Sequence, residues 1–303
     1  MPRRLSNNAS MTSSRLQRYY DRNTDLFLRI GSGGPALALH RGLWPPGVHS
    51  GREAARQIHH RVADAIQRAF PDGPRTVLDL GCGVGGTLFD LAERFPGSRF
   101  IGVTLSGRQI TIAREQARRR GLAERCSFLQ ADFETISLGQ RADVIIAIES
   151  FAHASRPDRF LATCRQHLAS RDARVIVVDD FLDASVATAG PAESARIETF
   201  RSAWNLPGLG TLEDFLGLAT RAGLRHAGTR DLSSWIRTDR LRDRLVSGIS
   251  PVAARLGLHR FPFWANVIGG NALSAAIRDG QVRYCMITCT RPVGAVGRVA
   301  KQP

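Results

Sequence analysis

The sequence predicts an α/β protein with a seven-stranded, mostly parallel sheet and helices on both faces. From Arg75 onward, short apolar segments alternate with amphipathic helical segments, as in parallel strands joined by crossover helices. A glycine-rich turn in residues 77–86 (VLDLGCGVGG) joins the first strand to a helix. The chain of 303 residues, 43% of them hydrophobic, is long enough for one large domain with additions or for two small domains.

The elements follow in a regular order. We expect strands at residues 77–80, 99–104, 126–130, 144–148, 173–178, 225–229 and 281–289, and helices at 15–29, 53–70, 87–95, 108–120, 160–168, 200–204 and 212–222. Residues 173–178 are apolar except for Arg174, as in a strand that is covered on both faces. We assign residues 1–70 to an N-terminal helical arm and lid, and residues 71–303 to the main domain. Long insertions near 184–210 and 232–271 are interpreted as a substrate cap.

The charge composition leaves two explanations open. The formal net charge is +15, and Lys301 is the single lysine among 42 basic residues. An anionic partner would explain the charge, but so would arginines spread over solvated helix faces. No basic run is interleaved with aromatic residues, so we do not expect a nucleic-acid partner. The arginine bias itself indicates a GC-rich bacterial genome.

The termini and cysteines indicate a cytoplasmic protein. No apolar stretch reaches the ~20 residues that span a bilayer, and no apolar segment of a secretory signal follows Arg3 and Arg4. The five cysteines are odd in number and lie mostly in apolar segments, as for buried thiols in a reducing compartment. Cys285 and Cys289 are four residues apart without further ligands, so we predict no metal site there.

The glycine turn predicts a nucleotide-type site. Asp79 ends the first apolar run, and Gly81, Gly83 and Gly85 follow at alternate positions before a helix. Such a turn presents bare backbone N–H groups and a helix N-terminus, and residues without a Cβ allow a ligand to approach closely. A tight strand-to-helix turn without a ligand is the alternative.

This G-x-G-x-G pattern with its preceding acid resembles motif I of the class I S-adenosylmethionine-dependent methyltransferases. The resemblance implies a Rossmann-like fold, S-adenosylmethionine as cofactor, and contacts from the loop to the methionine part of the cofactor. The second strand ends in Thr104, where that family usually has an acid, within GVTLSGRQ (residues 102–109). This is similar to the tocopherol, sterol and cyclopropane-type branch, which implies that Thr104 and Gln109 contact the ribose; plain strand capping is the alternative.

The next two strand ends carry further candidates. In the resembled family, Asp132 would accept a hydrogen bond from the adenine amino group, with Phe133 against the ring, although an Asp in this place is also a common turn former. The segment from Glu149 to His153 resembles an E-x-x-x-H stretch of sterol, tocopherol and prenyl-diphosphate C-methyltransferases. Glu149 is therefore a candidate general base and cofactor ligand. The alternatives are that it supports a residue that binds the cofactor, or that it caps the N-terminus of a helix. His153 is a candidate catalytic residue with a structural role as the alternative.

Residues outside the strand ends complete the candidate site. Tyr19, Tyr20 and Asp21 resemble the Tyr-Tyr-Asp helix that closes the pocket in that branch, and Tyr20 would contact the cofactor or stabilise a cation. The stretch from Arg29 to Trp44, which includes His40 and Arg41, is similar to bacterial C-methyltransferases that act on prenyl chains. Candidate pocket residues are Tyr19, Trp44, Phe151, Asp180 and Trp204, each also explained as core or wall.

One acidic segment formally matches a magnesium motif. Asp179, Asp180 and Asp183 have the DDxxD spacing of terpene synthases. Because these residues follow the fifth strand, a solvated strand end or a wall of the cofactor site explains them better. We therefore expect magnesium only if the substrate is a diphosphate.

Together these resemblances imply carbon methylation of an isoprenoid double bond in the biosynthesis of a terpenoid natural product. The resulting carbocation would lose a proton to Glu149 or cyclise. Alternatives are O- or N-methylation of another small metabolite, an RNA-binding methyltransferase, and a binding module with a vestigial cofactor site. We also expect a homo-oligomer, since an arm tethered by residues 31–34 could exchange between subunits.

Overall fold

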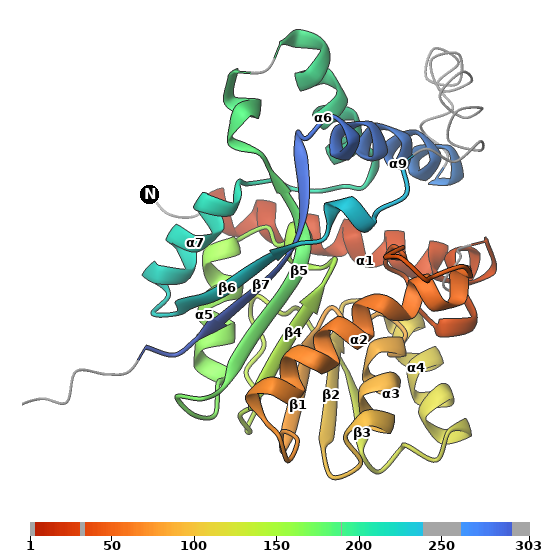
Figure 1. The fold of residues 1–303 in the computed structure, drawn as a ribbon, viewed down its shortest axis with the longest axis vertical. Helices are drawn as coiled ribbons and strands as arrows, with labels where there is room; N and C mark the ends of the chain where they lie inside the picture. Colours follow the sequence, from red (N-terminus) through yellow and green to blue (C-terminus); the bar gives the residue numbers. More distant parts are fainter. Residues whose placement is uncertain (1–3, 31–33, 189, 239–261, 293–303) are drawn as a thin grey trace, which may run out of the picture.

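The computed structural model describes residues 4–30, 34–188, 190–238 and 262–292, which form one seven-stranded sheet (Figure 1). The strand order is β3-β2-β1-β4-β5-β7-β6. The strands are β1 (Thr76–Leu80), β2 (Arg99–Thr104), β3 (Cys126–Gln130), β4 (Val144–Ile148), β5 (Arg174–Leu182), β6 (Arg225–Asp231) and β7 (Val282–Thr290). The first five strands are parallel, and β7 runs antiparallel between β5 and β6. The predicted fold class is confirmed.

Helices cover both faces of this sheet. The helices are α1 (Arg4–Ile30), α2 (Gly51–Ala69), α3 (Gly86–Arg94), α4 (Gly107–Arg119), α5 (Pro157–His167), α6 (Pro191–Ala203), α7 (Leu212–Arg221) and α9 (Pro262–Arg278). Helices α2, α3 and α4 share one apolar cluster with the sheet, and α5 and α7 share the cluster on its other face. Helix α1 crosses the end of the sheet nearest α6 and α9, which pack on each other (Figure 1).

Local sequence signals set several helix starts. Ser50 accepts a hydrogen bond from the backbone N–H of Glu53, and the Glu53 side chain returns to the backbone of Ser50, a capping box that begins α2. Ser106 caps α4 by accepting from the N–H of Gln109. These caps satisfy backbone donors that have no partner inside the helix.

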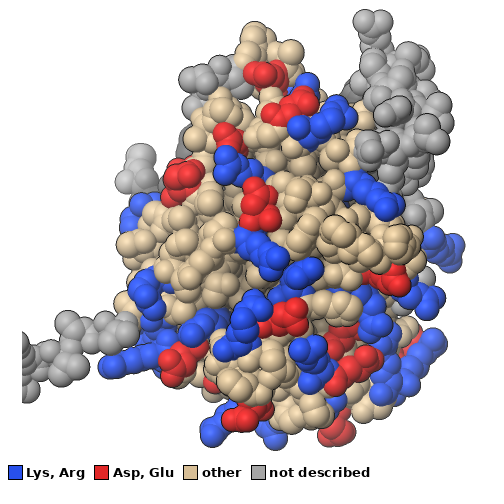
Figure 2. Space-filling model, in the orientation of Figure 1, with Lys and Arg blue, Asp and Glu red and all other residues tan. Residues whose placement is uncertain are grey.

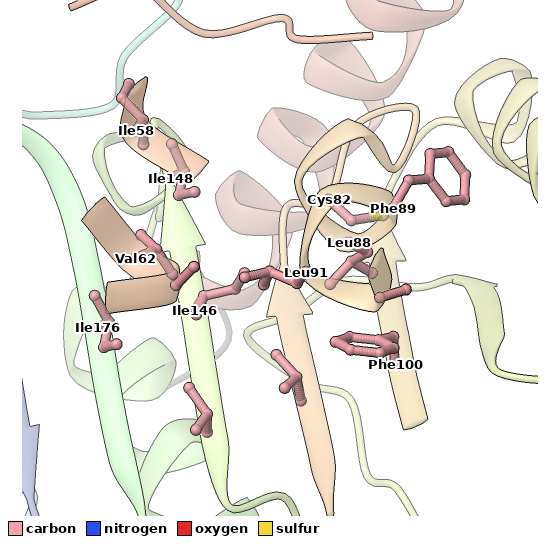
Figure 3. Close-up of a cluster of buried hydrophobic side chains, with 14 of the residues drawn as sticks. Ile58, Val62, Cys82, Leu88, Phe89, Leu91, Phe100, Ile146, Ile148 and Ile176 are labelled. Carbon is pink, nitrogen blue, oxygen red and sulfur yellow. The ribbon is translucent and has the colours of Figure 1, made fainter. Parts of the chain in front are cut away.

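The core under α2 and α3 is built from branched side chains on facing elements (Figure 3). Val62 of α2 and Leu91 of α3 lie beside Ile146 of β4, and Val62 also lies near Ile176 of β5; all four are at most 1% exposed. Ile58 of α2 lies beside Ile148 at the end of β4. Each fully buried aliphatic side chain stabilises the fold by about 1.5–3 kcal/mol relative to exposure. This packing fixes the sheet on which the strand ends are carried.

Three expectations needed adjustment. Strand β5 continues to Leu182, four residues beyond the predicted end, because it pairs with β7 along its whole length. Asp179 and Asp180 therefore lie within a strand, and at 2% and 4% exposure they are not a solvated strand end. The insertion at 184–210 contains the whole of α6 and not only its last turn. Within the insertion at 232–271, residues 239–261 lie outside the described residues.

The expectation for the cysteines is met in the described residues. All five cysteines are free thiols and buried, as the sequence predicted. Among the helices that the structure describes, none is long and apolar enough to cross a membrane.

Replacing Leu91 by alanine is expected to lower the free energy of unfolding by about 2–5 kcal/mol, because the side chain is fully buried and leaves a cavity. Leu129 in the edge strand β3 is 38% exposed, and its replacement by alanine is expected to cost less than about 1 kcal/mol. Urea unfolding of both variants measures the difference. Similar losses would contradict the assignment of the core to the α3 side of the sheet.

Candidate functional site

The glycine loop after β1 has the conformation that its sequence requires. Gly81 and Gly85 have φ angles of 101° and 88°, in the left-handed region that disfavours other residues. A Cβ on Gly81 would lie 2.3 Å from the Cβ of Ser150, so only glycine allows the two strand ends to meet. The N–H groups of Gly81 and Cys82 donate to the Val103 carbonyl of β2 at 2.8 and 3.0 Å. The loop is thus held against its neighbouring strand.

Asp79 lies at the entrance of this loop as a buried carboxyl group. It is 2% exposed, and its Oδ1 atom has no hydrogen-bond partner in the part of the chain that the structure describes. Burial raises the pKa of Asp79 to about 8. A buried acceptor without a partner is costly unless a ligand donates to it. A cationic amino group is a suitable ligand for it.

The end of β2 brings together the two predicted ribose residues. The Thr104 hydroxyl donates to Oε1 of Gln109 at 2.6 Å, and both side chains are buried. Next to them, Ser106 Oγ donates to Oδ1 of Asp21 on α1 at 2.6 Å. Helix α1 is therefore tied to this strand end. The ribose contacts themselves stay a prediction.

At the end of β3, Asp132 and Phe133 point to different surroundings. Asp132 Oδ1 accepts from the N–H of Glu134 at 2.9 Å, which is a turn-forming contact. The Phe133 ring is buried and meets the Phe160 ring edge-on at 5.3 Å between centroids. The hydrogen bond from Glu134 supports the alternative that Asp132 forms a turn. The adenine contacts of Asp132 and Phe133 stay a prediction.

Glu149, directly after β4, is held in an unusual conformation. Its φ angle is 49°, a left-handed value that is uncommon for a residue with a side chain and that clusters at functional sites. Its Oε1 atom accepts from the N–H and the Nε of Arg41, both at 3.0 Å, and from the Tyr284 hydroxyl at 2.8 Å. Within the described part of the chain, the hydrogen bonds to this carboxylate all end at Oε1 and none at Oε2.

Arg41 also binds a second acid. Its Nη2 donates to Oδ2 of Asp180 at 2.7 Å, and its guanidinium lies 4.3 Å above the Tyr284 ring. Burial alone would raise the pKa of Glu149, but the Arg41 charge and the hydrogen bonds from Arg41 and Tyr284 outweigh it, and that pKa is lowered. Burial raises the pKa of Asp180, against the opposing effect of Arg41. Glu149 is therefore the carboxylate that is kept ionised.

Asp179 differs from its neighbour because none of the arginines in the described ranges forms a salt bridge with it. Its Oδ2 accepts from the N–H of Ala152 at 3.0 Å. Burial and the nearby charge of Asp180 raise the pKa of Asp179 to about 7. Asp183 pairs instead with Arg283. The three acids of the DDxxD match thus have three different partners, and no group of three metal-ligating side chains occurs among the described residues.

Tyr20 and His153 meet above the β4 end. The Tyr20 hydroxyl and Nε2 of His153 lie 3.0 Å apart, which connects α1 to the segment after Glu149. Burial raises the pKa of Tyr20, with smaller contributions from neighbouring acidic groups. Burial lowers the pKa of His153 to about 4, although the Glu149 charge opposes this. His153 is therefore neutral at pH 7.

The predicted pocket aromatics do not form one cluster. Trp44 lies under the guanidinium of Arg237 at 3.6 Å and lines a cavity of about 520 Å³ with Trp235. Phe151 packs among the core rings of Phe160, Phe181 and Phe215. Trp204 packs on Phe200 of α6, and Tyr19 packs on Tyr20 and Phe27 within α1. Such contacts are also typical of core residues, so they do not separate a pocket role from a core role.

Two residues of the site were missing from the candidate set. Arg41 was noted only as part of the stretch from Arg29 to Trp44, and Tyr284 was not singled out. An arginine between two apolar leucines, in the sequence LHRGL (residues 39–43), was the available signal for the first. The hydroxyl of Tyr284 in a last strand with five apolar residues was the available signal for the second.

The face of the molecule in Figure 2 carries both basic and acidic side chains. Basic and acidic side chains alternate over that face. Many arginines are paired there or elsewhere, for example Arg56 with Asp90 and Arg108 with Asp25. This distribution agrees with the interpretation of most arginines as solvated helix residues.

Comparisons with known proteins agree with this geometry. A family model described as a methyltransferase domain matches residues 77–171. Ajmaline N-methyltransferase of Rauvolfia serpentina is 24% identical, over 84% of this chain and 90% of its own length. 24-methylenesterol C-methyltransferase 2 of Oryza sativa subsp. japonica is 35% identical, over 46% of this chain and only 36% of its own length. The structure of a geranyl diphosphate methyltransferase in complex with GPP and sinefungin has a TM-score of 0.72 at 17% identity, and covers 93% of this chain and 100% of that one. This last likeness shows a shared fold.

Replacing Gly81 by alanine is expected to weaken the binding of S-adenosylmethionine at least about tenfold, because the new Cβ would collide with Ser150 and the φ angle disfavours alanine. Gly97→Ala is the matched control, since a Cβ there meets no atom within 4 Å. Isothermal titration calorimetry measures both affinities. Equal affinities would contradict the role of the loop.

Replacing Asp79 by asparagine is expected to change how the stability of the ligand-free protein depends on pH. Because the folded pKa of about 8 lies above the unfolded value of 3.8, the wild-type protein loses stability as the pH rises through this window. The variant lacks that loss, so its melting temperature relative to wild type is expected to increase from pH 4 to pH 8. Exposed Asp72→Asn is the control. A difference that does not vary with pH would refute the buried, protonated state.

Proposed function

This chain belongs to the class I S-adenosylmethionine-dependent methyltransferases, and we propose that it methylates a carbon of an isoprenoid double bond. The observation on which the proposal rests is the Glu149 carboxylate at the end of β4, whose Oε1 accepts hydrogen bonds from Arg41 and Tyr284. S-adenosylmethionine, when bound, supplies an electrophilic methyl group on a sulfonium.

The residues present fit this cofactor. The glycine loop turns from β1 into α3 through positive φ angles that glycine allows, and the unpartnered Oδ1 of Asp79 suits a cationic amino group. We assign the loop and Asp79 to the methionine part, Thr104 and Gln109 to the ribose, and Asp132 to the adenine. Tyr20 on α1 would cover this site, consistent with residues 1–70 acting as a lid.

Glu149 has the properties that carbon methylation of an alkene requires. Methyl addition to a double bond leaves a carbocation, and a proton on the neighbouring carbon must be lost. That proton is so acidic that a carboxylate with a lowered pKa still accepts it. The same negative charge also stabilises the cation before the proton leaves. The accepting atom would be Oε2, since Arg41 and Tyr284 occupy Oε1.

His153 is less suited to the base role that O-methylation would need. With a pKa near 4 it binds a proton weakly at pH 7. Its Nε2 is engaged with the Tyr20 hydroxyl. We therefore assign His153 and Tyr20 to a contact that positions α1 over the site.

The relatives support this choice in part. Similar proteins include 24-methylenesterol C-methyltransferase 2 and a geranyl diphosphate methyltransferase. Both names refer to isoprenoid compounds. The second candidate is N-methylation of a small metabolite, which is favoured by the long match to ajmaline N-methyltransferase. A bacterial source, natural-product biosynthesis, a cytoplasmic location and a homo-oligomer stay predictions from the sequence.

The experiment is incubation with methyl-labelled S-adenosylmethionine and a panel of prenyl diphosphates, neutral prenylated metabolites, phenols and amines, followed by mass spectrometry. Label on a carbon of a prenyl chain is the expected result. Magnesium is varied in parallel, and a requirement for it is expected only with diphosphates. Label on an amine or phenol alone would reject carbon methylation.

Glu149→Gln is expected to lower kcat about 10²–10⁴-fold, because the variant lacks the proton acceptor. Asp180→Asn is the matched control, since Asp180 is also buried and also bonded to Arg41. The control is expected to lose much less activity in the same labelling assay. Equal losses would indicate that Glu149 only holds Arg41 in place.

A further inference from the structure

A continuous chain of polar contacts runs from the surface of α3 to Glu149. Asp90 Oδ2 lies 2.7 Å from Nδ1 of His59, and Nε2 of His59 lies 2.7 Å from Nε2 of His40. The other ring nitrogen of His40 lies 3.0 Å from the carbonyl oxygen of Arg41. Arg41 in turn donates to Glu149 through both its N–H and its Nε.

The number of protons in this series of polar contacts follows from the groups that can only accept a hydrogen bond. The Arg41 carbonyl accepts only, and Asp90 is an ionised carboxylate because Arg56 and His59 bond to it and lower its pKa despite burial. Three hydrogen bonds are made by the two rings: one to Asp90, one between the rings, and one to the Arg41 carbonyl. Each bond needs its own proton, whereas two neutral imidazoles carry only two. The His40–His59 pair therefore holds one extra proton.

The surroundings place that proton on one ring. His59 is 1% exposed and is the ring that touches Asp90. Burial and the neighbouring His59 lower the pKa of His40 to about 4, so His40 is the neutral ring. The charged and titratable groups that face the pair are Arg56 and His60 on α2, Asp90 on α3, Arg41 in the preceding loop and Glu149 after β4.

The loop that carries Arg41 depends on this support. Gly42 lies so close to α2 that a Cβ would approach the Cβ of Ala54 to 2.9 Å. The N–H of Leu43 donates to the Ala54 carbonyl at 2.9 Å. The Arg41 peptide is thus fixed from α2 on one side and by the Glu149 carboxylate on the other.

We propose that His59 is a positioning residue for the methyl transfer: the His40–His59 pair, with one proton more than two neutral rings, fixes Arg41 and so orients Glu149. Loss of the extra proton removes the hydrogen bond to the Arg41 carbonyl, because His40 must then donate to His59 instead. The effect on turnover rests on the proposed function of Glu149; the protonation state does not.

Two variants that break the same salt bridge test the proposal. Asp90→Asn removes the negative charge beside the His40–His59 pair, so the extra proton of the pair is expected to leave at a lower pH than in the wild-type protein. Arg56→Gln removes a positive charge bonded to the same carboxylate, so the proton is expected to leave at a higher pH. A merely structural salt bridge would give both variants the same effect.

The readout is a pH titration by ¹⁵N NMR of histidine-labelled protein, with signals assigned by their loss in His40→Gln. At neutral pH the wild-type protein is expected to show one ring protonated on both nitrogens and one neutral ring. The alkaline limb of kcat, measured with the acceptor found by labelling, is expected to shift with the NMR midpoint in both variants. Two neutral rings in the wild-type spectrum, or shifts in the same direction for both variants, would overturn the proposal without affecting the assignment of carbon methylation.

Discussion

The buried guanidinium of Arg41 is the interaction on which the candidate site depends. It joins Glu149 after β4 to Asp180 in β5 and lies over the ring of Tyr284 in β7. An acidic side chain with little access to water loses hydration when it is ionised, and the guanidinium that bonds to both acids offsets this cost. Because that cation is carried by a loop docked on α2, the same contact also places the N-terminal region over the strand ends.

The glycine loop and Glu149 belong to one rigid frame. Gly81 has no Cβ, and therefore the side chain of Ser150 approaches the loop and donates to the Leu80 carbonyl at 2.6 Å. Ser150 follows Glu149 directly, so this contact helps to hold the left-handed backbone of Glu149. The loop assigned to the methyl donor and the carboxylate assigned to the proton thus have fixed relative positions, as proximity catalysis requires.

Where local pattern decides the structure, the sequence was a good guide. The strands and the glycine turn follow from apolar runs and special backbone angles, and Thr104 and Gln109 meet because a capped helix starts beside the strand end. The exception is β5, whose two adjacent aspartates suggested a solvated strand end. Their burial depends on Arg41 and on the N–H of Ala152, and neither contact is visible in the local sequence.

The sequence by itself determined the α/β fold class and the glycine loop, since these depend on periodicity and on residues near one another in the chain. The tertiary structure alone decided which charges meet. Arg41 lies 108 positions from Glu149 and 139 from Asp180, and Tyr284 lies 135 from Glu149. Such pairs are selected by the cost of leaving a buried charge uncompensated, which depends on the folded surroundings and leaves no periodic signal in the sequence.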